Sequence, residues 1–229
     1  MVTARRTKAL LSRERILAAA TAVADAEGIS AVTMRRVSER LECEAMSLYH
    51  YVADKRSLLD GLVGTVIGEV VSVAAAIPDS DDWREAVRGR CLAARQVMLR
   101  HPWAPALTAT SNTVPPESME LYEQFVGTLV SAEFSYDLAH RAIHALGSMV
   151  LGFSNELFEP AGSAPQEPTA EELAAMSQRM PHLARLAAMD VHDADGALSV
   201  CDTQAEFEFT LGLVLDGLEA ARLARSHAH

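Results

Sequence analysis

The stretch that decides the fold runs from residue 33 to residue 59 and reads TMRRVSERLECEAMSLYHYVADKRSLL. Thr33 can cap a short helix at the start of this stretch. The chain then breaks at residues 42–44, and a second short helix is predicted over residues 45–51. Two short helices joined by a tight turn describe a helix-turn-helix.

Longer helices are predicted on both sides of this motif. Residues 12–27 repeat apolar side chains at a spacing of three or four, and Gly28 follows as a stop signal. After the motif, Asp54 can cap a longer helix that carries two adjacent apolar stripes over residues 58–71. Because a helix that is apolar on two sides must be buried between two bodies, we expect this one to connect the N-terminal module to the rest of the chain.

Helical periodicity continues to the C-terminus, with no strand alternation longer than a few residues. Beyond Pro78 we predict helices over residues 83–98, 117–132, 136–159, 169–188 and 203–224. The predicted fold is therefore all-α. A three-helix helix-turn-helix domain over residues 1–56 is joined by the long helix to an α-helical domain over residues 57–229.

The charge is unevenly distributed between these two parts. The whole chain carries −11, but residues 1–60 sum to +2 and residues 61–229 to −13. The first fifteen residues sum to +4, which suits contact with phosphate groups, although an ordinary solvated terminus has the same composition. A slightly basic module is attached to a strongly acidic body.

The cysteines and the hydropathy indicate a reduced cytoplasmic protein. Cys43, Cys91 and Cys201 are scattered and odd in number, which favours neither a disulfide framework nor a zinc site. The N-terminus lacks the apolar core of a signal peptide. We also expect no membrane span, because no uninterrupted run of about 18 apolar residues occurs.

Residues 12–62 closely resemble the TetR family of transcriptional regulators. The resemblance rests on Thr33 at the start of the second helix, on the Leu48-Tyr49 pair, on Tyr51, on Lys55 and on Leu58-Leu59. Farther on, the chain is similar to the tetracycline-repressor branch in two segments, LGSMVLG over residues 146–152 and LDGLE over residues 215–219.

The resemblance implies a one-component repressor that binds palindromic operator DNA as a homodimer and is released by a small-molecule effector, with no cofactor. The two recognition helices would lie about 34–36 Å apart, one turn of DNA. Residues 136–159 and 203–224 are the best candidates for a four-helix dimer interface, although both helices could instead be core.

The DNA contacts follow from how such a motif meets a duplex, with the start of the recognition helix on base edges and its flanks on phosphates. We expect contacts from Thr33, Arg35, Glu44, Ala45, Met46, Ser47, Tyr49, Tyr51 and Lys55. Glu44 either reads a cytosine amino group or caps its helix, and the two tyrosines could instead pack within the domain. Glu42 stands where the family often has glycine, so we expect a less strained turn.

The effector cavity should lie in the acidic body, where apolar side chains are mixed with a few polar ones. The candidates, each of which could be ordinary core, are Met98, Trp103, Leu107, Thr108, Ser111, Asn112, Tyr122, Phe125, Ser148, Phe153 and Glu156. The tetracycline branch chelates a magnesium–drug complex at positions that fall here on Thr108 and Ser148, with Phe125 at its glutamine. The resemblance therefore implies a more apolar ligand without a metal.

Other functions are less well supported by the sequence. His140 and His144 have a spacing that could hold a metal, but no carboxylate accompanies them, and the rim of the dimer helix is the simpler interpretation. No Ser-His-Asp order, phosphate-binding glycine loop or paired catalytic carboxylates stand out, so we expect no enzyme. The alternatives are an α-helical small-molecule-binding protein or enzyme without DNA binding, or an interaction module that has lost it.

Overall fold

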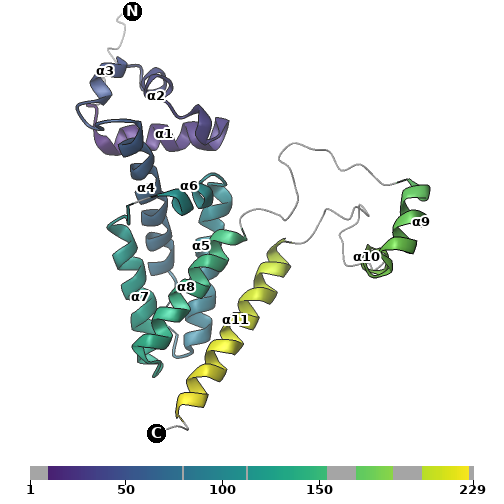
Figure 1. Cartoon of the computed structure of the whole chain (residues 1–229). Helices are drawn as coiled ribbons and strands as arrows, with labels where there is room; N and C mark the ends of the chain where they lie inside the picture. The colour runs from purple at the N-terminus through teal and green to yellow at the C-terminus, as the bar shows by residue number, and fades with distance from the viewer. Residues whose placement is uncertain (1–9, 79, 112, 154–168, 188–202, 227–229) are drawn as a thin grey trace, which may run out of the picture. The chain divides into compact units, whose positions relative to one another are not determined.

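The computed structural model of the chain describes residues 10–78, 80–111, 113–153, 169–187 and 203–226. All regular elements in these ranges are helices (Figure 1), so the prediction of an all-α fold is confirmed. The chain divides into two compact units, residues 1–154 and residues 155–229, which are described separately.

The N-terminal unit begins with three helices and a short 3-10 turn. They are α1 (Arg13–Glu27), η1 (Ile29–Ala31), α2 (Met34–Arg40) and α3 (Ala45–Leu48). The hydroxyl of Ser12 accepts the backbone N–H of Arg15 and caps α1, and the hydroxyl of Thr33 accepts that of Arg36, as predicted for α2. Their shared core consists of fully or almost fully buried apolar side chains, among them Ile16, Ala20, Val23, Val37 and Leu48.

Helix α3 is shorter than the sequence predicts, since it ends at Leu48 instead of Tyr51. The chain continues as tight turns, in which Tyr51 donates its backbone N–H to the carbonyl of Leu48. Leu48 and Val52 are both buried, so their packing holds this segment against the domain without a longer helix.

Helix α4 (Lys55–Ala75) is the long connector that the apolar stripes predict. Asp54 caps it by accepting the backbone N–H of Ser57 at 2.7 Å. Buried residues occur along the whole length of the helix, from Leu58 to Ala74. The helix packs against α1 as well as against α5, α6 and α7. Its two-sided apolar pattern is therefore explained by contacts with two bodies.

The expectation that nothing in the chain could span a membrane needs a correction at α4. By length and mean hydropathy, residues 55–75 would be able to cross a bilayer. The helix contains no uninterrupted apolar run of that length, because single polar residues such as Asp60, Thr65 and Glu69 interrupt it. Its mean hydropathy nevertheless stays high. Since the apolar stripes of α4 pack against four other helices, this helix has the character of a core helix.

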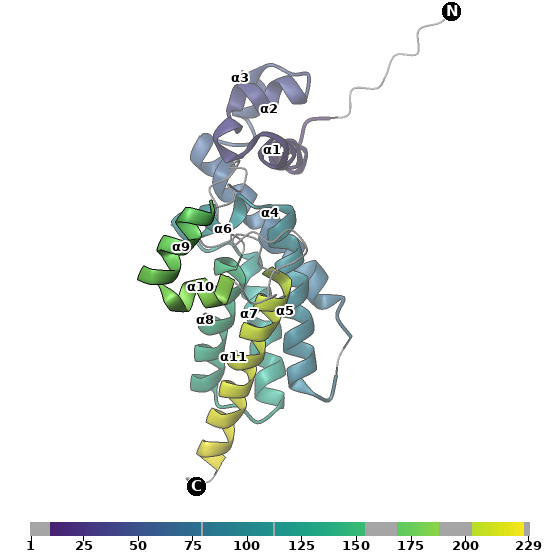
Figure 2. The same ribbon diagram turned by 90° about the vertical axis from the view of Figure 1, so that its right-hand side faces the viewer.

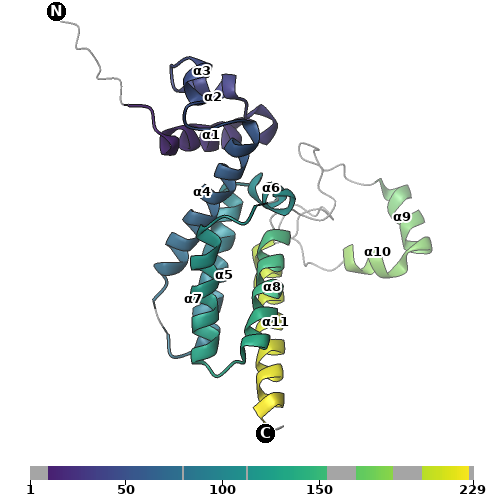
Figure 3. The same ribbon diagram turned by 60° about the vertical axis from the view of Figure 1, so that its left-hand side comes forward.

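Four more helices complete the N-terminal unit. They are α5 (Trp83–Arg100), α6 (Ala104–Thr110), α7 (Glu117–Ser131) and α8 (Tyr136–Gly152). Helices α5, α7 and α8 lie alongside one another with α4, and the short α6 lies between this bundle and the N-terminal helices (Figures 1 and 3). The predicted continuation of α8 to residue 159 lies outside the described residues.

The C-terminal unit contains α9 (Ala170–Arg179), α10 (Pro181–Ala187) and α11 (Thr203–Ser226) (Figure 2). A single helix was predicted over residues 169–188, but it breaks before Pro181. Proline has no backbone N–H to donate and disfavours helical backbone in the residue before it, whereas it is well tolerated at the start of a helix. Helices α9 and α10 pack on each other.

The turn between α2 and α3 contradicts the expectation of a less strained backbone. Glu42 has a φ of 53°, in the left-handed region that glycine adopts without cost. Placing an L-residue there costs about 1–2 kcal/mol, so glutamate fills the position without changing the geometry of the turn. Glu133, which follows α7, has a similar φ of 65°.

We predict that Glu42→Gly raises the free energy of unfolding by up to about 1 kcal/mol, because relief of the left-handed strain exceeds the entropic cost of glycine. Urea unfolding followed by circular dichroism measures the change. The matched control is Gln96→Gly, an exposed position within α5, which should lower the stability by about 1 kcal/mol. Equal destabilisation by both substitutions would contradict the strain at Glu42.

Candidate nucleic-acid interface and ligand cavity

The predicted DNA-contacting residues occupy the start of α2, the whole of α3 with the turn after it, and the first turn of α4. Within α3 and the turns after it, some side chains are exposed to solvent and others are buried in the domain. Met46, Tyr49 and Tyr51 are 71%, 45% and 43% exposed, whereas Leu48 and Val52 are buried. Nearly half of each tyrosine is therefore accessible to solvent and can contact a binding partner.

The two arginines at the start of α2 differ in their environments. Arg35 is 88% exposed and donates from Nε to Glu39 at 2.9 Å, one turn along the same helix. Arg36 donates from Nη2 to Glu27 of α1 at 2.7 Å, and this hydrogen bond holds the pKa of Glu27 below its usual range. Arg36 thus fastens α2 to α1. Arg35 has only an exposed ion pair of the kind that contributes little stability and exchanges easily.

The remaining predicted contacts surround α3. Glu44 occupies the N-cap position of α3, but its side chain makes no capping hydrogen bond and is exposed, which argues against the capping role. Ala45 and Ser47 are half-buried, and Lys55 is exposed as the first residue of α4. Thr33 uses its hydroxyl as the cap of α2. The nine residues thus come from one continuous part of the N-terminal module.

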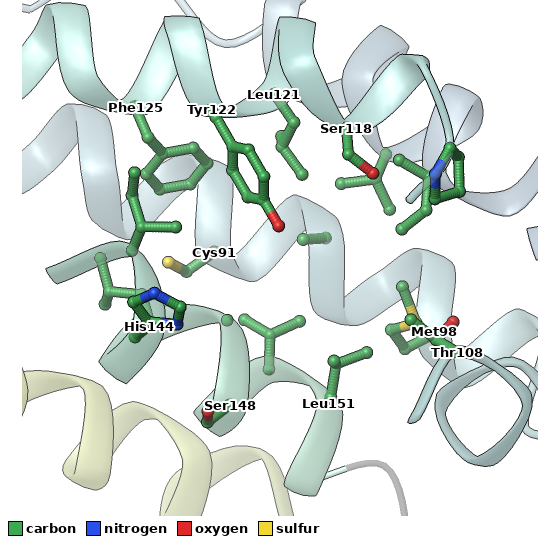
Figure 4. Close-up of a pocket in the computed structure, with 18 residues that line it drawn as sticks. Cys91, Met98, Thr108, Ser118, Leu121, Tyr122, Phe125, His144, Ser148 and Leu151 are labelled. Carbon is green, nitrogen blue, oxygen red and sulfur yellow. The ribbon is translucent and has the colours of Figure 1, made fainter. Parts of the chain in front are cut away.

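A cavity of about 270 Å³ lies within the bundle of the N-terminal unit (Figure 4). Helices α4, α5, α7 and α8 and the α6–α7 segment all contribute to its walls. Five of the predicted effector-binding residues line it, namely Met98, Thr108, Tyr122, Phe125 and Ser148. The rest of the wall is largely apolar, which is typical of a small-molecule site.

The cavity has two distinguishable ends (Figure 4). Phe125 and His144 lie at one end, and Met98 and Thr108 lie at the other, while the hydroxyl of Tyr122 points into the space between them. An elongated or flat apolar molecule with a few oxygen atoms matches this arrangement.

The other predicted effector residues lie elsewhere in the structure. Leu107 packs against the buried cluster of Val63, Ile67 and Val71. Trp103 is buried and donates its indole N–H to Asp25 of α1. Ser111 hydrogen-bonds within its own loop, and the backbone carbonyl of Phe153 accepts from buried Arg95. Asn112 and Glu156 lie outside the described residues.

Sequence reasoning missed several residues of the cavity wall, including Cys91, Ser118, Leu121, Ile143, His144 and Leu151. Cys91 was considered as one of three scattered cysteines and not as a cavity residue. Burial raises the pKa of its thiol to about 12, so the thiol stays protonated and acts as part of the apolar wall. His144 was considered only with His140, and the two rings lie edge to face at 4.6 Å between centroids.

The part of the chain that the structure describes contains no recognisable metal site. No group of three or more His, Cys, Asp or Glu side chains there is arranged so that it could hold a metal ion. The ligand cavity therefore contains no set of donors that could hold a metal among its described residues.

Two family models match the chain. "Bacterial regulatory proteins, tetR family" matches residues 16–62, and "Tetracyclin repressor-like, C-terminal domain" matches residues 77–222. The tetracycline repressor protein class C of Escherichia coli is 28% identical over 215 residues, which cover 93% of each chain. An HTH-type transcriptional regulator of Saccharopolyspora erythraea is 32% identical over 147 residues, 64% of this chain and 61% of its own.

Solved structures from Streptomyces coelicolor are also similar. A possible TetR family transcriptional regulator is 28% identical with a TM-score of 0.73, and the match covers 92% of this chain and all of that one. ActR in complex with (S)-DNPA is 25% identical with a TM-score of 0.72, covering 92% of this chain and 98% of its own.

We predict that Gly147→Leu weakens ligand binding in the cavity without unfolding the chain. Gly147 lines the cavity, and a Cβ built there meets nothing within 4 Å, so a leucine side chain would occupy open space. Fluorescence titration with an anilinonaphthalenesulfonate dye should show at least about tenfold weaker binding, a loss of about 1.4 kcal/mol.

Gly152→Leu is the matched control, because Gly152 also lies in α8 with open space around it but does not line the cavity. The control should bind the dye with the same affinity as the wild type and should have the same oligomeric state. If both variants kept full dye binding, the dye would be binding outside this cavity and the assignment would fail.

Proposed function

The chain belongs to the TetR family of transcriptional regulators, and on this basis we propose that α2 and α3 bind operator DNA and that the cavity binds the effector which releases it. It is a ligand-responsive repressor and not an enzyme. The observation that carries the proposal is the exposure of Met46, Tyr49 and Tyr51 beside buried Leu48, on α3 and the turns after it, which resemble the family's recognition helix.

We divide the DNA contacts by chemistry. Arg35 can reach a guanine once it leaves its exposed partner Glu39, Ser47 can bond to several bases, and Met46 suits the methyl group of thymine. Glu44 makes no capping bond, so its carboxylate is available for a cytosine amino group. Tyr49, Tyr51 and Lys55 suit phosphates, which fix the register without reading sequence.

Electrostatics favour one orientation on DNA. Residues 1–60 carry a net charge of +2, whereas the rest of the chain carries −13 and repels phosphates. We therefore place the domain boundary between residues 56 and 57, so that residues 1–56 meet DNA and residues 57–229 bind the effector and form the dimer. A cytoplasmic location follows from the need to reach the operator.

We propose that the chain acts as a homodimer, whose two heads would bind successive major grooves about 34–36 Å apart. Residues 136–159 and 203–224 remain our candidates for the interface. Each described helix in these ranges exposes large apolar side chains: Tyr136 on α8 is 74% exposed, and Phe209 and Leu213 on α11 are more than half exposed. Such residues are suited to burial against a partner.

The effector that suits the cavity is a flat, largely apolar molecule carrying a few oxygen atoms. Phe125 and Tyr122 offer ring faces, and the hydroxyls of Thr108 and Ser118 offer hydrogen bonds. The similar ActR structure holds (S)-DNPA, and the tetracycline repressors are named for tetracycline. Because Thr108 and Ser148 stand at the chelating positions of the tetracycline branch, we propose a ligand bound without a metal.

Release would follow from a shift in population between two arrangements of the heads. Helix α4 lines the cavity with Ile67 and Val70, and its N-terminal half packs against α1. One rigid helix therefore touches both the effector and the DNA-binding module. An effector that favours a different tilt of α4 would change the spacing of the two heads.

We predict tight, salt-sensitive binding to the intergenic DNA upstream of the protein's own coding sequence, measured by fluorescence anisotropy at several salt concentrations. Lys55→Ala should make the slope of log affinity against log salt less negative by about 2 per dimer, because one phosphate contact per head is lost. Tyr49→Ala should weaken binding by about tenfold through loss of a phosphate contact.

Arg179→Ala, an exposed cation on α9, is the charge-matched control and should leave both quantities unchanged. Absence of DNA binding at low salt would favour the alternative of a small-molecule-binding protein. A salt slope unaffected by Lys55→Ala would remove that residue from the interface.

A further inference from the structure

A buried histidine joins three helices at the base of the helix-turn-helix. His101 directly follows α5, and its side chain is only 10% exposed. Its Nδ1 lies 2.8 Å from Oδ1 of Asp25 on α1, and its Nε2 lies 3.0 Å from Oε2 of Glu69 on α4. One imidazole ring thus bridges two carboxylates, one on the DNA-binding module and one on the connecting helix.

The groups around this ring form a small polar cluster. Asp25 Oδ1 also accepts the indole N–H of Trp103 at 2.6 Å, and the Trp103 ring lies beside the imidazole. Glu69 is contacted by the guanidinium of Arg100 from α5. Burial tends to raise the pKa of Glu69, but the hydrogen bonds from Arg100 and His101 outweigh it and hold that pKa below its usual range. Glu69 is therefore ionised at neutral pH.

The geometry depends on the number of protons on the imidazole. An ionised carboxylate only accepts hydrogen bonds, so each of the two contacts needs an N–H on the ring. The neutral ring has one N–H and the imidazolium has two. The complete bridge between α1 and α4 is therefore made by the imidazolium, and loss of one proton leaves one of the two contacts without its hydrogen.

The same segment of chain is part of the ligand cavity. Met98 lines the cavity one turn before His101, and Thr108 lines it from the helix that begins after Trp103. The residues that hold α1 thus lie between two cavity-lining positions. A ligand that moves either position would also move the donors that face Asp25.

We propose that Asp25, Glu69, His101 and Trp103 form a proton-dependent latch that fixes the helix-turn-helix on the body and thereby sets operator affinity. This inference rests on the proposed function. The latch is complete while both ring nitrogens of His101 carry a hydrogen, and loss of one of these protons leaves one carboxylate contact unmade. Because a dimer must hold both heads at one spacing, a weakened latch lowers operator affinity.

The test compares operator affinity at about pH 6 and about pH 8, at constant ionic strength, for the full chain and three variants. In the wild type the affinity should fall by about tenfold at the higher pH, within the range usual for coupled sites. His101→Gln should bind with an affinity that no longer changes with pH, because the glutamine amide does not titrate.

Asp25→Asn provides a second route if the first variant fails to fold. Asparagine keeps an oxygen that can accept from Trp103 but removes the charge that pairs with the imidazolium, so its pH response should also be lost. His182→Gln is the matched control, because His182 is an exposed histidine on α10 and belongs neither to the predicted DNA surface nor to the latch. Its variant should keep the wild-type response to pH.

The outcomes separate the two proposals. A wild-type pH response retained in both His101→Gln and Asp25→Asn would overturn the latch while leaving operator binding intact. A response lost only in His182→Gln would assign the effect to a histidine outside the latch and also overturn the latch. Absence of operator binding at both pH values would contradict the proposed function and, with it, the regulatory role of the latch.

Discussion

The burial of α4 against both the N-terminal helices and the bundle is the constraint on which the rest of the N-terminal unit depends. This helix packs against α1 and also against α5, α6 and α7, so neither the DNA-binding module nor the body is complete without it. The contact with α1 is close at Gly61, where a Cβ would come within 2.6 Å of a methyl carbon of Leu17. A larger residue at this position would require the buried side chain of Leu17 to move.

This shared helix also explains why polar contacts gather at the same level of the molecule. Apolar packing alone permits small rotations of α1 on α4, because it has no preferred direction. Hydrogen bonds from His101 and Trp103 to Asp25 add direction, since they are satisfied in one orientation. Apolar packing therefore holds α1 against α4, and the hydrogen bonds of the polar cluster fix the angle between the two helices.

Much of this arrangement could be predicted from the sequence, and the failures have physical causes. The caps at Thr33 and Asp54 and the two-sided stripe of α4 are local patterns, and local patterns predict helices well. The left-handed backbone at Glu42 was missed because glutamate gives no signal for it. Trp103 was predicted to line the cavity because aromatic side chains are common in ligand sites and Trp103 lies close in sequence to other predicted cavity residues. Its actual partner, Asp25, lies 78 residues away in the sequence.

The protonated thiol of Cys91 has a consequence for the kinds of molecule that the cavity can sense. Burial raises the pKa of this thiol to about 12, and the thiolate is the form that attacks electrophiles. The thiol therefore stays protonated at neutral pH, and a ligand of this cavity is held by packing and hydrogen bonds, without a covalent bond to Cys91.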